Sequence, residues 1–109
     1  MKIRTEQQKD NIRTWVKALR SGIYPQTTEV LEDEDGFCCL GVACVIGLAK
    51  PDRSETTPSF PTRESMEESF GLPANPQIPK MSTSLVYMND HCYTFDEIAD
   101  AIEETFLDD

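Results

Sequence analysis

The residues of this chain best suited to chemistry are its cysteines and its single histidine. Cys38, Cys39 and Cys44 lie within a nearly uncharged stretch, and Cys92 directly follows His91. Thiolate and imidazole groups are the usual ligands of structural zinc, and a thiolate can also act as a nucleophile. These residues make zinc binding and thiol catalysis the two kinds of chemistry to consider.

The spacing of these residues gives zinc binding little support. Structural zinc sites usually draw their ligands from cysteine pairs separated by about two to four residues. Cys39 and Cys44 have four residues between them, and those residues, Leu40 to Ala43, lack the turn-forming types of a zinc knuckle. We therefore predict no metal and no other cofactor. A zinc site, if formed, would use Cys39, Cys44, His91 and Cys92.

Packing in a core is the better explanation of the cysteines. Free cysteine is among the most buried residue types and behaves as a small apolar side chain. A thiol nucleophile needs a base or a helix N-terminus that stabilises its thiolate. Cys39 precedes a predicted helix, but nothing in the sequence places His91 beside it. We therefore predict a protein without catalytic residues that is not an enzyme.

The chain is strongly acidic, and its charge is unevenly distributed. The formal net charge is −10 over 109 residues, yet residues 1–20 carry a net +4 and the rest a net −14. Phosphate contacts need a dominating basic surface, so we expect no direct binding to nucleic acid. No apolar run approaches the roughly 20 residues of a membrane helix, and the first residues lack a signal-peptide pattern. We expect a cytosolic protein with reduced cysteines and no membrane contact.

The clearest helical patterns lie near the two ends of the chain. A first helix is expected over residues 5–21, with a capping box at Thr5 and Gln8. Its apolar stripe has helical period and consists of Ile12, Trp15, Val16 and Leu19. A last helix begins at Thr94, where Glu97 completes a second capping box.

The residues between these helices predict smaller elements. The acidic run Glu32–Asp35 and Gly36 are expected to form the loop of a short β-hairpin whose strands flank it. Residues 40–50 favour a short buried helix, in which Gly41 and Gly47 indicate close approach of another backbone. The later segments are expected as a polar loop over residues 51–60, a helix over 62–70, an extended proline-rich linker over 72–80, and a short helix from about 82 to 90.

These elements predict the fold class and the domain organisation. We expect an α+β fold that is mainly α, with four to five short helices and one small β-hairpin. One modest core is what a chain of this length supports, so residues 1–109 are expected to form a single globular domain.

Two charged surfaces are candidates for binding. An acidic surface for a protein partner would consist of Glu32, Asp33, Glu34, Asp35, Asp96, Asp100, Glu103 and Glu104. A basic stripe on the first helix could bind a small anionic ligand with the help of residues just after that helix. This second set consists of Arg13, Lys17, Arg20, Tyr24 and Gln26. Asn89, Asp90 and His91 could join it in a polar pocket, or could serve only as turn residues.

Several short segments occur in an order that resembles a known set of proteins. They are Trp15–Gly22 with Tyr24 and Gln26, then Phe37–Cys44 (Phe-Cys-Cys-Leu-Gly-Val-Ala-Cys), Gly71-Leu72, Met88–Asp90 and Thr94–Ala99. This order resembles small proteins of unknown function that are common in tailed bacteriophages and prophages. The chain departs from their usual pattern in its short, proline-rich middle. The resemblance implies a phage gene product made in the cytoplasm of a bacterial host.

The leading functional hypothesis joins this resemblance to the acidic surface. We expect an accessory protein that binds a host protein, in defence or metabolism, and inhibits or modulates it. One alternative is sequestration of a small anionic, nucleotide-like ligand at the basic stripe. The least favoured alternative is a zinc- or thiol-dependent enzyme.

Overall fold

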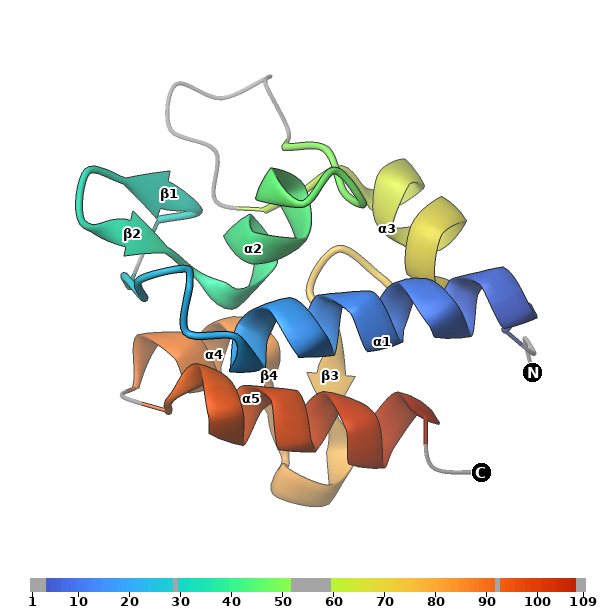
Figure 1. The fold of residues 1–109 in the computed structure, drawn as a ribbon. Coiled ribbons are helices and arrows are strands. Elements are labelled where there is room, and N and C mark those ends of the chain that lie inside the picture. Colours follow the sequence, from blue (N-terminus) through green and yellow to red (C-terminus); the bar gives the residue numbers. More distant parts are fainter. Residues whose placement is uncertain (1–3, 29, 52–59, 92, 108–109) are drawn as a thin grey trace.

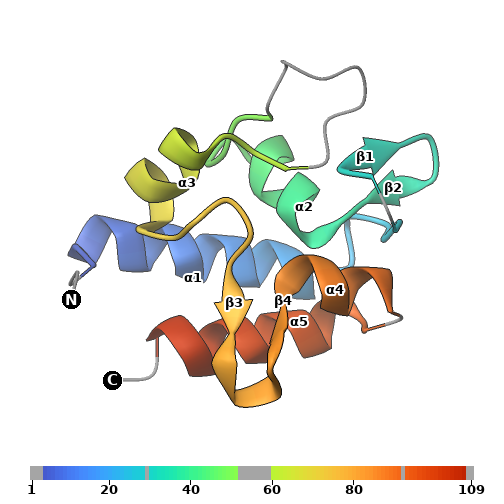
Figure 2. The same ribbon diagram turned by 180° about the vertical axis from the view of Figure 1, so that it is seen from behind.

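Two antiparallel helices pack side by side along the length of the fold. They are α1 (Glu6–Arg20) and α5 (Phe95–Ile102), and they lie side by side in both ribbon views (Figures 1 and 2). The computed structural model describes residues 4–28, 30–51, 60–91 and 93–107. Most of the polar loop predicted over residues 51–60 therefore lies outside the described residues, as does Cys92.

Both predicted capping boxes are confirmed. The Thr5 hydroxyl accepts a hydrogen bond from the Gln8 amide at 3.1 Å, and the Gln8 side chain accepts one from the Thr5 amide at 2.9 Å. Thr94 and Glu97 make the same pair of bonds at 3.1 and 2.9 Å. These side chains satisfy backbone donors that a helix start leaves free, which fixes where α1 and α5 begin. After α5 the chain continues into a single π-helical turn, Glu103–Leu107.

Three shorter helices pack against this pair. Helices α2 (Cys39–Val45) and α3 (Arg63–Phe70) cover one flank of α1, while α4 (Leu85–Asp90) lies behind α5 in Figure 1. Helix α2 is shorter than the predicted span of 40–50. It ends because the chain turns at Gly47, whose φ of +85° is a left-handed conformation that glycine adopts readily. The described residues therefore form five α-helices, within the predicted range.

The described residues form two small antiparallel strand pairs rather than the single predicted hairpin. The first pair joins β1 (Glu32–Asp33) to β2 (Gly36–Phe37), so Glu32, Asp33 and Gly36 lie in its strands, and only Glu34 and Asp35 form the expected loop. The second pair joins β3 (Gln77–Ile78) to β4 (Thr83–Ser84) through a 3₁₀ turn, Pro79–Met81. Strand β3 lies in the segment that was predicted to be an extended linker. Strand β4 lies at the start of the helix predicted from about 82 to 90, so α4 begins only at Leu85.

One core joins all five helices, as expected for a mainly α, α+β domain. The predicted stripe of α1 is buried throughout, and Trp15 stacks on Phe70 of α3 with ring centroids 4.9 Å apart. The remaining large buried side chains of the helices include Leu40, Val42, Met66, Leu85, Met88, Ile98 and Ile102. Among the described residues, no helix is long and apolar enough to cross a bilayer.

Gly41 confirms the prediction of a close backbone contact, and Gly47 does not. A Cβ atom added to Gly41 would lie 2.0 Å from the carbonyl oxygen of Leu31, far inside any real contact. A Cβ atom added to Gly47 would meet nothing within 4 Å. Gly41 therefore allows α2 to pack directly against the backbone that leads into β1, whereas Gly47 serves the turn that ends α2.

Candidate binding surfaces

The cysteines before and within α2 are placed for packing. Cys39 is fully buried, and its thiol lies 3.6 Å from the carbonyl oxygen of Leu85. Cys38 is the N-cap of α2, and its sulfur accepts a hydrogen bond from the Gly41 amide at 3.3 Å. Burial raises the pKa of Cys38 to about 11 and raises the pKa of Cys39 well above its ordinary value. Both thiols are therefore protonated near neutral pH, the opposite of what a nucleophile needs.

The residues proposed for zinc do not form a site in the described part of the chain. Cys39 and Cys44 both lie on α2, and five residues of separation place them about 140° apart around a helix. His91 is engaged elsewhere, because its ring stacks on Tyr87 and its Nδ1 lies 2.9 Å from the Tyr87 carbonyl oxygen. No group of three or more His, Cys, Asp or Glu side chains among the described residues could hold a metal ion.

Asn89 brings together residues that the sequence analysis had proposed for a polar pocket. Its side-chain oxygen accepts hydrogen bonds from the Gln26 amide group at 2.9 Å and from the Cys39 backbone at 3.2 Å. Its amide nitrogen donates to the Thr27 carbonyl at 2.7 Å. Asn89 is the one described polar residue that is fully buried in this core, and it ties three segments together. Gln26 and Asn89 do meet, but their polar groups bind each other and the backbone.

The basic stripe of α1 is largely occupied by neighbouring carboxylates. Arg20 pairs with Asp100 at 2.7 Å and with Glu103, both from the C-terminal part of the chain. Arg13 pairs with Asp10 at 2.6 Å on the same helix. Lys17 is exposed, while Tyr24 packs edge-on against Phe37, with centroids 5.8 Å apart. The structure therefore does not gather Arg13, Lys17, Arg20, Tyr24 and Gln26 around one anion site.

The acidic residues of the last helix are partly neutralised within the molecule. Asp100 and Glu103 share Arg20, and Glu104 pairs with Lys80 from the turn between β3 and β4. Asp96 is exposed, and no described cation lies within ion-pairing distance of it. This face therefore offers a partner less free negative charge than its sequence indicates.

The acidic hairpin, which we define as residues 32–37, keeps most of its charge free. Glu32, Glu34 and Asp35 are exposed, and none has an ion-pair partner among the described residues. Asp33 differs, because its carboxylate accepts bonds from the Asp35 amide at 2.9 Å, the Gly36 amide at 3.1 Å and the Thr27 hydroxyl at 3.0 Å. Three carboxylates therefore face solvent, while the fourth builds the turn that presents them.

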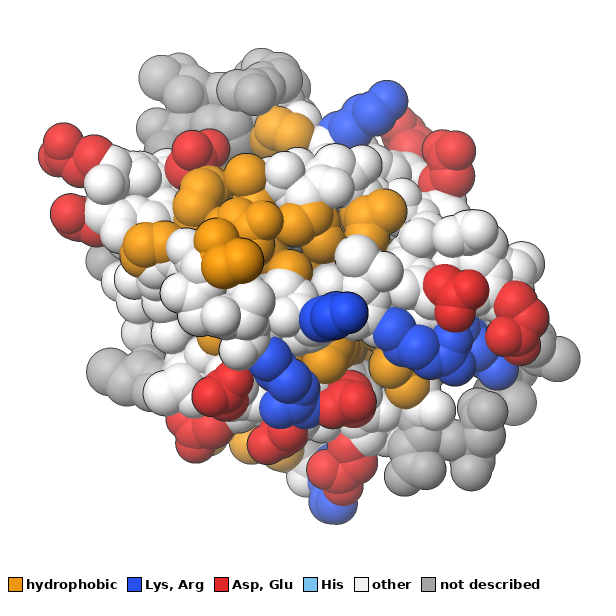
Figure 3. All heavy atoms as spheres, in the orientation of Figure 1, with side chains coloured by type: hydrophobic (Ala, Val, Ile, Leu, Met, Phe, Trp, Pro, Cys, Tyr) orange, Lys and Arg blue, Asp and Glu red, His pale blue; other side chains and the backbone are white. Residues whose placement is uncertain are grey.

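An apolar surface adjoins the acidic hairpin. Figure 3 shows hydrophobic side chains gathered over α2 and the nearby end of the hairpin, with acidic side chains at its edge. Val45 of α2 is 47% exposed. Four further apolar residues of β2, α2 and the turn after α2 are partly exposed, namely Phe37, Cys44, Ile46 and Leu48. We call Val45 and these four residues the α2 patch.

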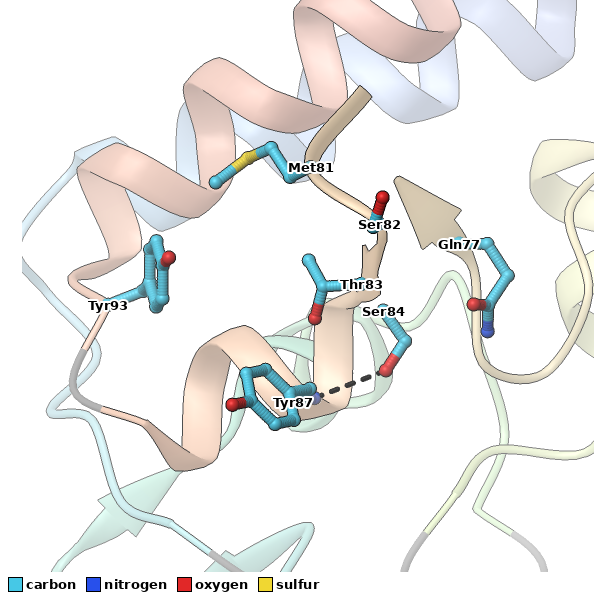
Figure 4. A pocket seen from close by; sticks show the side chains of 7 residues that line it. All are labelled: Gln77, Met81, Ser82, Thr83, Ser84, Tyr87 and Tyr93. Atoms are coloured by element: carbon cyan, nitrogen blue, oxygen red, sulfur yellow. Dashed lines mark hydrogen bonds between the residues drawn. The ribbon is translucent and has the colours of Figure 1, made fainter. Parts of the chain in front are cut away.

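A hollow of about 540 Å³ lies between the second strand pair and α4. Its lining residues are Gln77, Met81, Ser82, Thr83, Ser84, Tyr87 and Tyr93. In Figure 4 the side chains of Met81, Thr83, Tyr87 and Tyr93 converge around one space, while Gln77 lies to the side. The sequence analysis missed this tyrosine hollow, because its residues were assigned to a linker and to the ends of short helices.

Comparison with known proteins gives a family but no function. No curated protein and no solved structure matches the chain. A family model described as a domain of unknown function, DUF8296, matches residues 7–75, which include α1 except its first residue, the acidic hairpin, α2 and α3. The match covers more than half of the chain, so the protein belongs to this DUF8296 family.

Proposed function

We propose that this protein is a phage-encoded accessory protein that binds a host protein in the bacterial cytoplasm and inhibits or modulates it. The observation that carries the proposal is the pairing of the acidic hairpin with the α2 patch. Three exposed carboxylates without described cation partners lie beside a group of partly exposed apolar side chains. The phage origin and the cytoplasmic location rest on the sequence resemblance.

This pairing suits a protein interface better than a small-molecule site. Protein interfaces combine an apolar centre with a polar rim, and exposed apolar patches on small soluble proteins often mark such contacts. Charge at the rim steers encounter and selects partners of opposite charge. The expected partner therefore presents an apolar surface flanked by lysine or arginine side chains.

The acidic hairpin is held in place before any partner arrives. The Phe37 amide donates to the Pro25 carbonyl at 2.9 Å, and the Thr27 amide donates to the Phe37 carbonyl at 2.8 Å. A Cβ atom on Gly36 would lie 2.4 Å from the Pro25 oxygen, so the strand packs tightly on this preceding segment. Because an ordered surface loses less conformational entropy on binding, this support favours affinity.

The two alternative functions receive less support. Sequestration of an anionic ligand needs free cations, whereas Arg13 and Arg20 are paired with carboxylates. The family match identifies no enzyme family, and the buried thiols of Cys38 and Cys39 have pKa values raised by burial. Binding through the acidic hairpin and the α2 patch is therefore the function we favour.

The test compares two variants that lose the same amount of charge. E32Q/E34Q/D35N neutralises the exposed carboxylates of the acidic hairpin, and E6Q/D10N/E67Q neutralises three exposed carboxylates on α1 and α3. Each protein is immobilised and exposed to lysate of the host bacterium, and the retained proteins are quantified by mass spectrometry. We expect the natural chain and the control variant to retain one host protein in stoichiometric amount, and the hairpin variant to lose it.

A third variant tests the apolar part of the surface. V45S removes apolar area at the most exposed position of the α2 patch and should weaken capture of the same host protein. Equal retention by all the variants would refute the proposed surface. Failure of the natural chain to retain any stoichiometric host protein would refute the proposed function.

A further inference from the structure

The tyrosine hollow contains a hydroxyl group that the fold leaves without a partner. The Oγ1 atom of Thr83 is closed off from solvent and makes no hydrogen bond in the structure. A buried polar atom without a partner destabilises a fold, and most such atoms in proteins are satisfied. Valine has nearly the same shape and would avoid this penalty at a strand position. A bound ligand that hydrogen-bonds to Thr83 would explain why a hydroxyl suits this position.

The turn at the rim of the hollow adopts an unusual backbone conformation. Ser82 has φ +53° and ψ +41°, the left-handed region that residues other than glycine seldom occupy, and it is the one described non-glycine residue with positive φ. Such conformations concentrate at binding and catalytic sites, where the surrounding structure maintains them. At Ser82 the left-handed conformation directs the chain from the 3₁₀ turn into β4, which carries Thr83.

The aromatic part of the hollow is exposed but held in place. Tyr87 is 53% exposed, yet its ring stacks on His91 with centroids 3.8 Å apart and planes 13° from parallel. The His91 ring is itself anchored through Nδ1 to the Tyr87 carbonyl oxygen. Met81, 43% exposed, supplies a flexible thioether that can move aside from the space it lines. The hollow therefore combines a fixed aromatic ring with an adaptable side chain.

The chemistry of the lining limits the ligand. The described lining residues offer hydroxyl, amide, phenol and thioether groups, and none of them carries a charge. Lys80, which precedes Met81, is ion-paired with Glu104. A phosphate group would therefore find no cation in the lining of a chain whose net charge is −10. The volume lies within the range of small-molecule sites.

From these observations we propose that the tyrosine hollow binds a neutral, flat heteroaromatic ring of the nucleoside type. Such a ring has a face that stacks on tyrosine and edge groups that hydrogen-bond to hydroxyl and amide side chains. Thr83 contributes the hydrogen bond that it lacks in the free protein, once a side chain that covers its Oγ1 atom moves aside, and Tyr87 contributes the stacking face. The site is separate from the acidic hairpin, so it does not depend on the proposed host-protein interface.

The test uses the full chain labelled with ¹⁵N. Adenosine, guanosine, cytidine and uridine are titrated separately to millimolar concentration while backbone amide chemical shifts are recorded. At least one nucleoside should shift the amides of Ser82, Thr83, Tyr87 and Tyr93 and leave those of the acidic hairpin unchanged. Methyl glucoside is titrated in parallel as a neutral ligand that lacks an aromatic ring.

Two variants assign the roles of Thr83 and Tyr87. T83V should weaken nucleoside binding about tenfold and leave the melting temperature unchanged or higher, because an unpartnered hydroxyl is removed. Y87A should also weaken binding about tenfold through loss of stacking. T14V, which removes an exposed hydroxyl on α1, should bind as the natural chain does.

Four outcomes would overturn the proposal. They are the absence of shifts with every nucleoside, shifts centred on residues outside the hollow, unchanged binding by T83V, and equal shifts with methyl glucoside. The last outcome would show that the hollow recognises sugar hydroxyl groups rather than a heteroaromatic ring.

Discussion

The acidic hairpin and the start of α2 are neighbours in sequence but differ in how much the fold constrains them. In the hairpin, Glu32, Glu34 and Asp35 are exposed and unpaired among the described residues. In the next segment, residues 38–43, every side chain is buried, and Gly41 lies against the Leu31 carbonyl. Cys38 and Cys39 are the residues whose type suggests zinc binding or catalysis, yet they belong to the buried segment. The groups that are exposed to a binding partner are the carboxylates of the hairpin.

This difference predicts which substitutions will change stability and which will change binding. A change in residues 38–43 disturbs contacts that several elements share, so it should alter stability. A change in the exposed hairpin carboxylates disturbs almost no internal contact, so it should alter binding instead. Four predictions test this distinction, from the largest expected effect on stability to the smallest.

The largest effect is expected for G41A. Its new Cβ atom would lie 2.0 Å from the Leu31 oxygen, so the backbone of α2 or of Leu31 must shift. We expect a loss of about 3 kcal/mol in the free energy of unfolding, measured by urea denaturation. G47A is the matched control, since its Cβ meets no atom and only the left-handed backbone resists it, at about 1 kcal/mol. Equal losses for the two variants would refute the close contact at Gly41.

The next effect is expected for N89A. This change leaves the Cys39 amide and the Thr27 carbonyl without their side-chain partner in a buried place. We expect a loss of about 2 kcal/mol in the free energy of unfolding. Q26A removes an exposed member of the same network and should lose less than about 1 kcal/mol. If N89A is no more damaging than Q26A, Asn89 does not act as the centre of the network.

A smaller effect is expected from alkaline pH. Burial raises the pKa of Cys38 from 9.0 to about 11, so the thiol ionises first in the unfolded chain. Its contribution to stability is complete below pH 9 and is lost as the pH rises toward 11. The free energy of unfolding should therefore fall over this pH range. In C38S, whose serine keeps an oxygen atom at the capping position, the free energy of unfolding should fall less. Parallel pH profiles for the two proteins would contradict this role of Cys38.

The smallest effect on stability is expected for E32Q/E34Q/D35N. These side chains are exposed and unpaired among the described residues, so the free energy of unfolding should change by less than about 0.5 kcal/mol. D33N is the contrasting single change, because the Asp33 carboxylate accepts three hydrogen bonds. Thermal denaturation of both variants makes the comparison. A larger loss for the triple variant than for D33N would show that the exposed carboxylates stabilise the fold.

Local signals in the sequence predicted the helices well because their causes are local. The capping boxes at Thr5 and Thr94 and the stripe of α1 depend on residues three or four positions apart. The strands were harder to predict. Strands β3 and β4 are two residues long, too short for an alternating pattern. The prolines around β3 indicated a linker, and the residues of β4 were assigned to the start of a helix. In the first hairpin the turn was predicted, but its position was not. The Asp33 carboxylate accepts bonds from the Asp35 and Gly36 amides, which confines the turn to the residues between Asp33 and Gly36.

The candidate surfaces were only partly predictable because pairing between distant residues determines them. The sequence identified the acidic residues, but the pairing of Arg20 with Asp100 joins positions 80 residues apart. Because of that pairing, the last helix has less free negative charge than the acidic hairpin. The tyrosine hollow was missed because Thr83 and Tyr93 come together only through the packing of β4 beside α4 and the start of α5. Whether a hydroxyl group has a hydrogen-bond partner depends on the folded structure and cannot be read from the sequence.

The buried position of Trp15 gives the protein an internal optical reporter. Trp15 is the sole tryptophan of the chain, its indole N–H donates to the Cys39 carbonyl at 2.9 Å, and its ring lies on Phe70. An indole enclosed in this way should fluoresce at shorter wavelengths than one in water, and its emission should shift to the red when α1 separates from α2 and α3. Changes confined to the acidic hairpin or the tyrosine hollow should leave that emission unaltered. One spectrum can therefore distinguish a variant that has lost its fold from one that has lost only a binding surface.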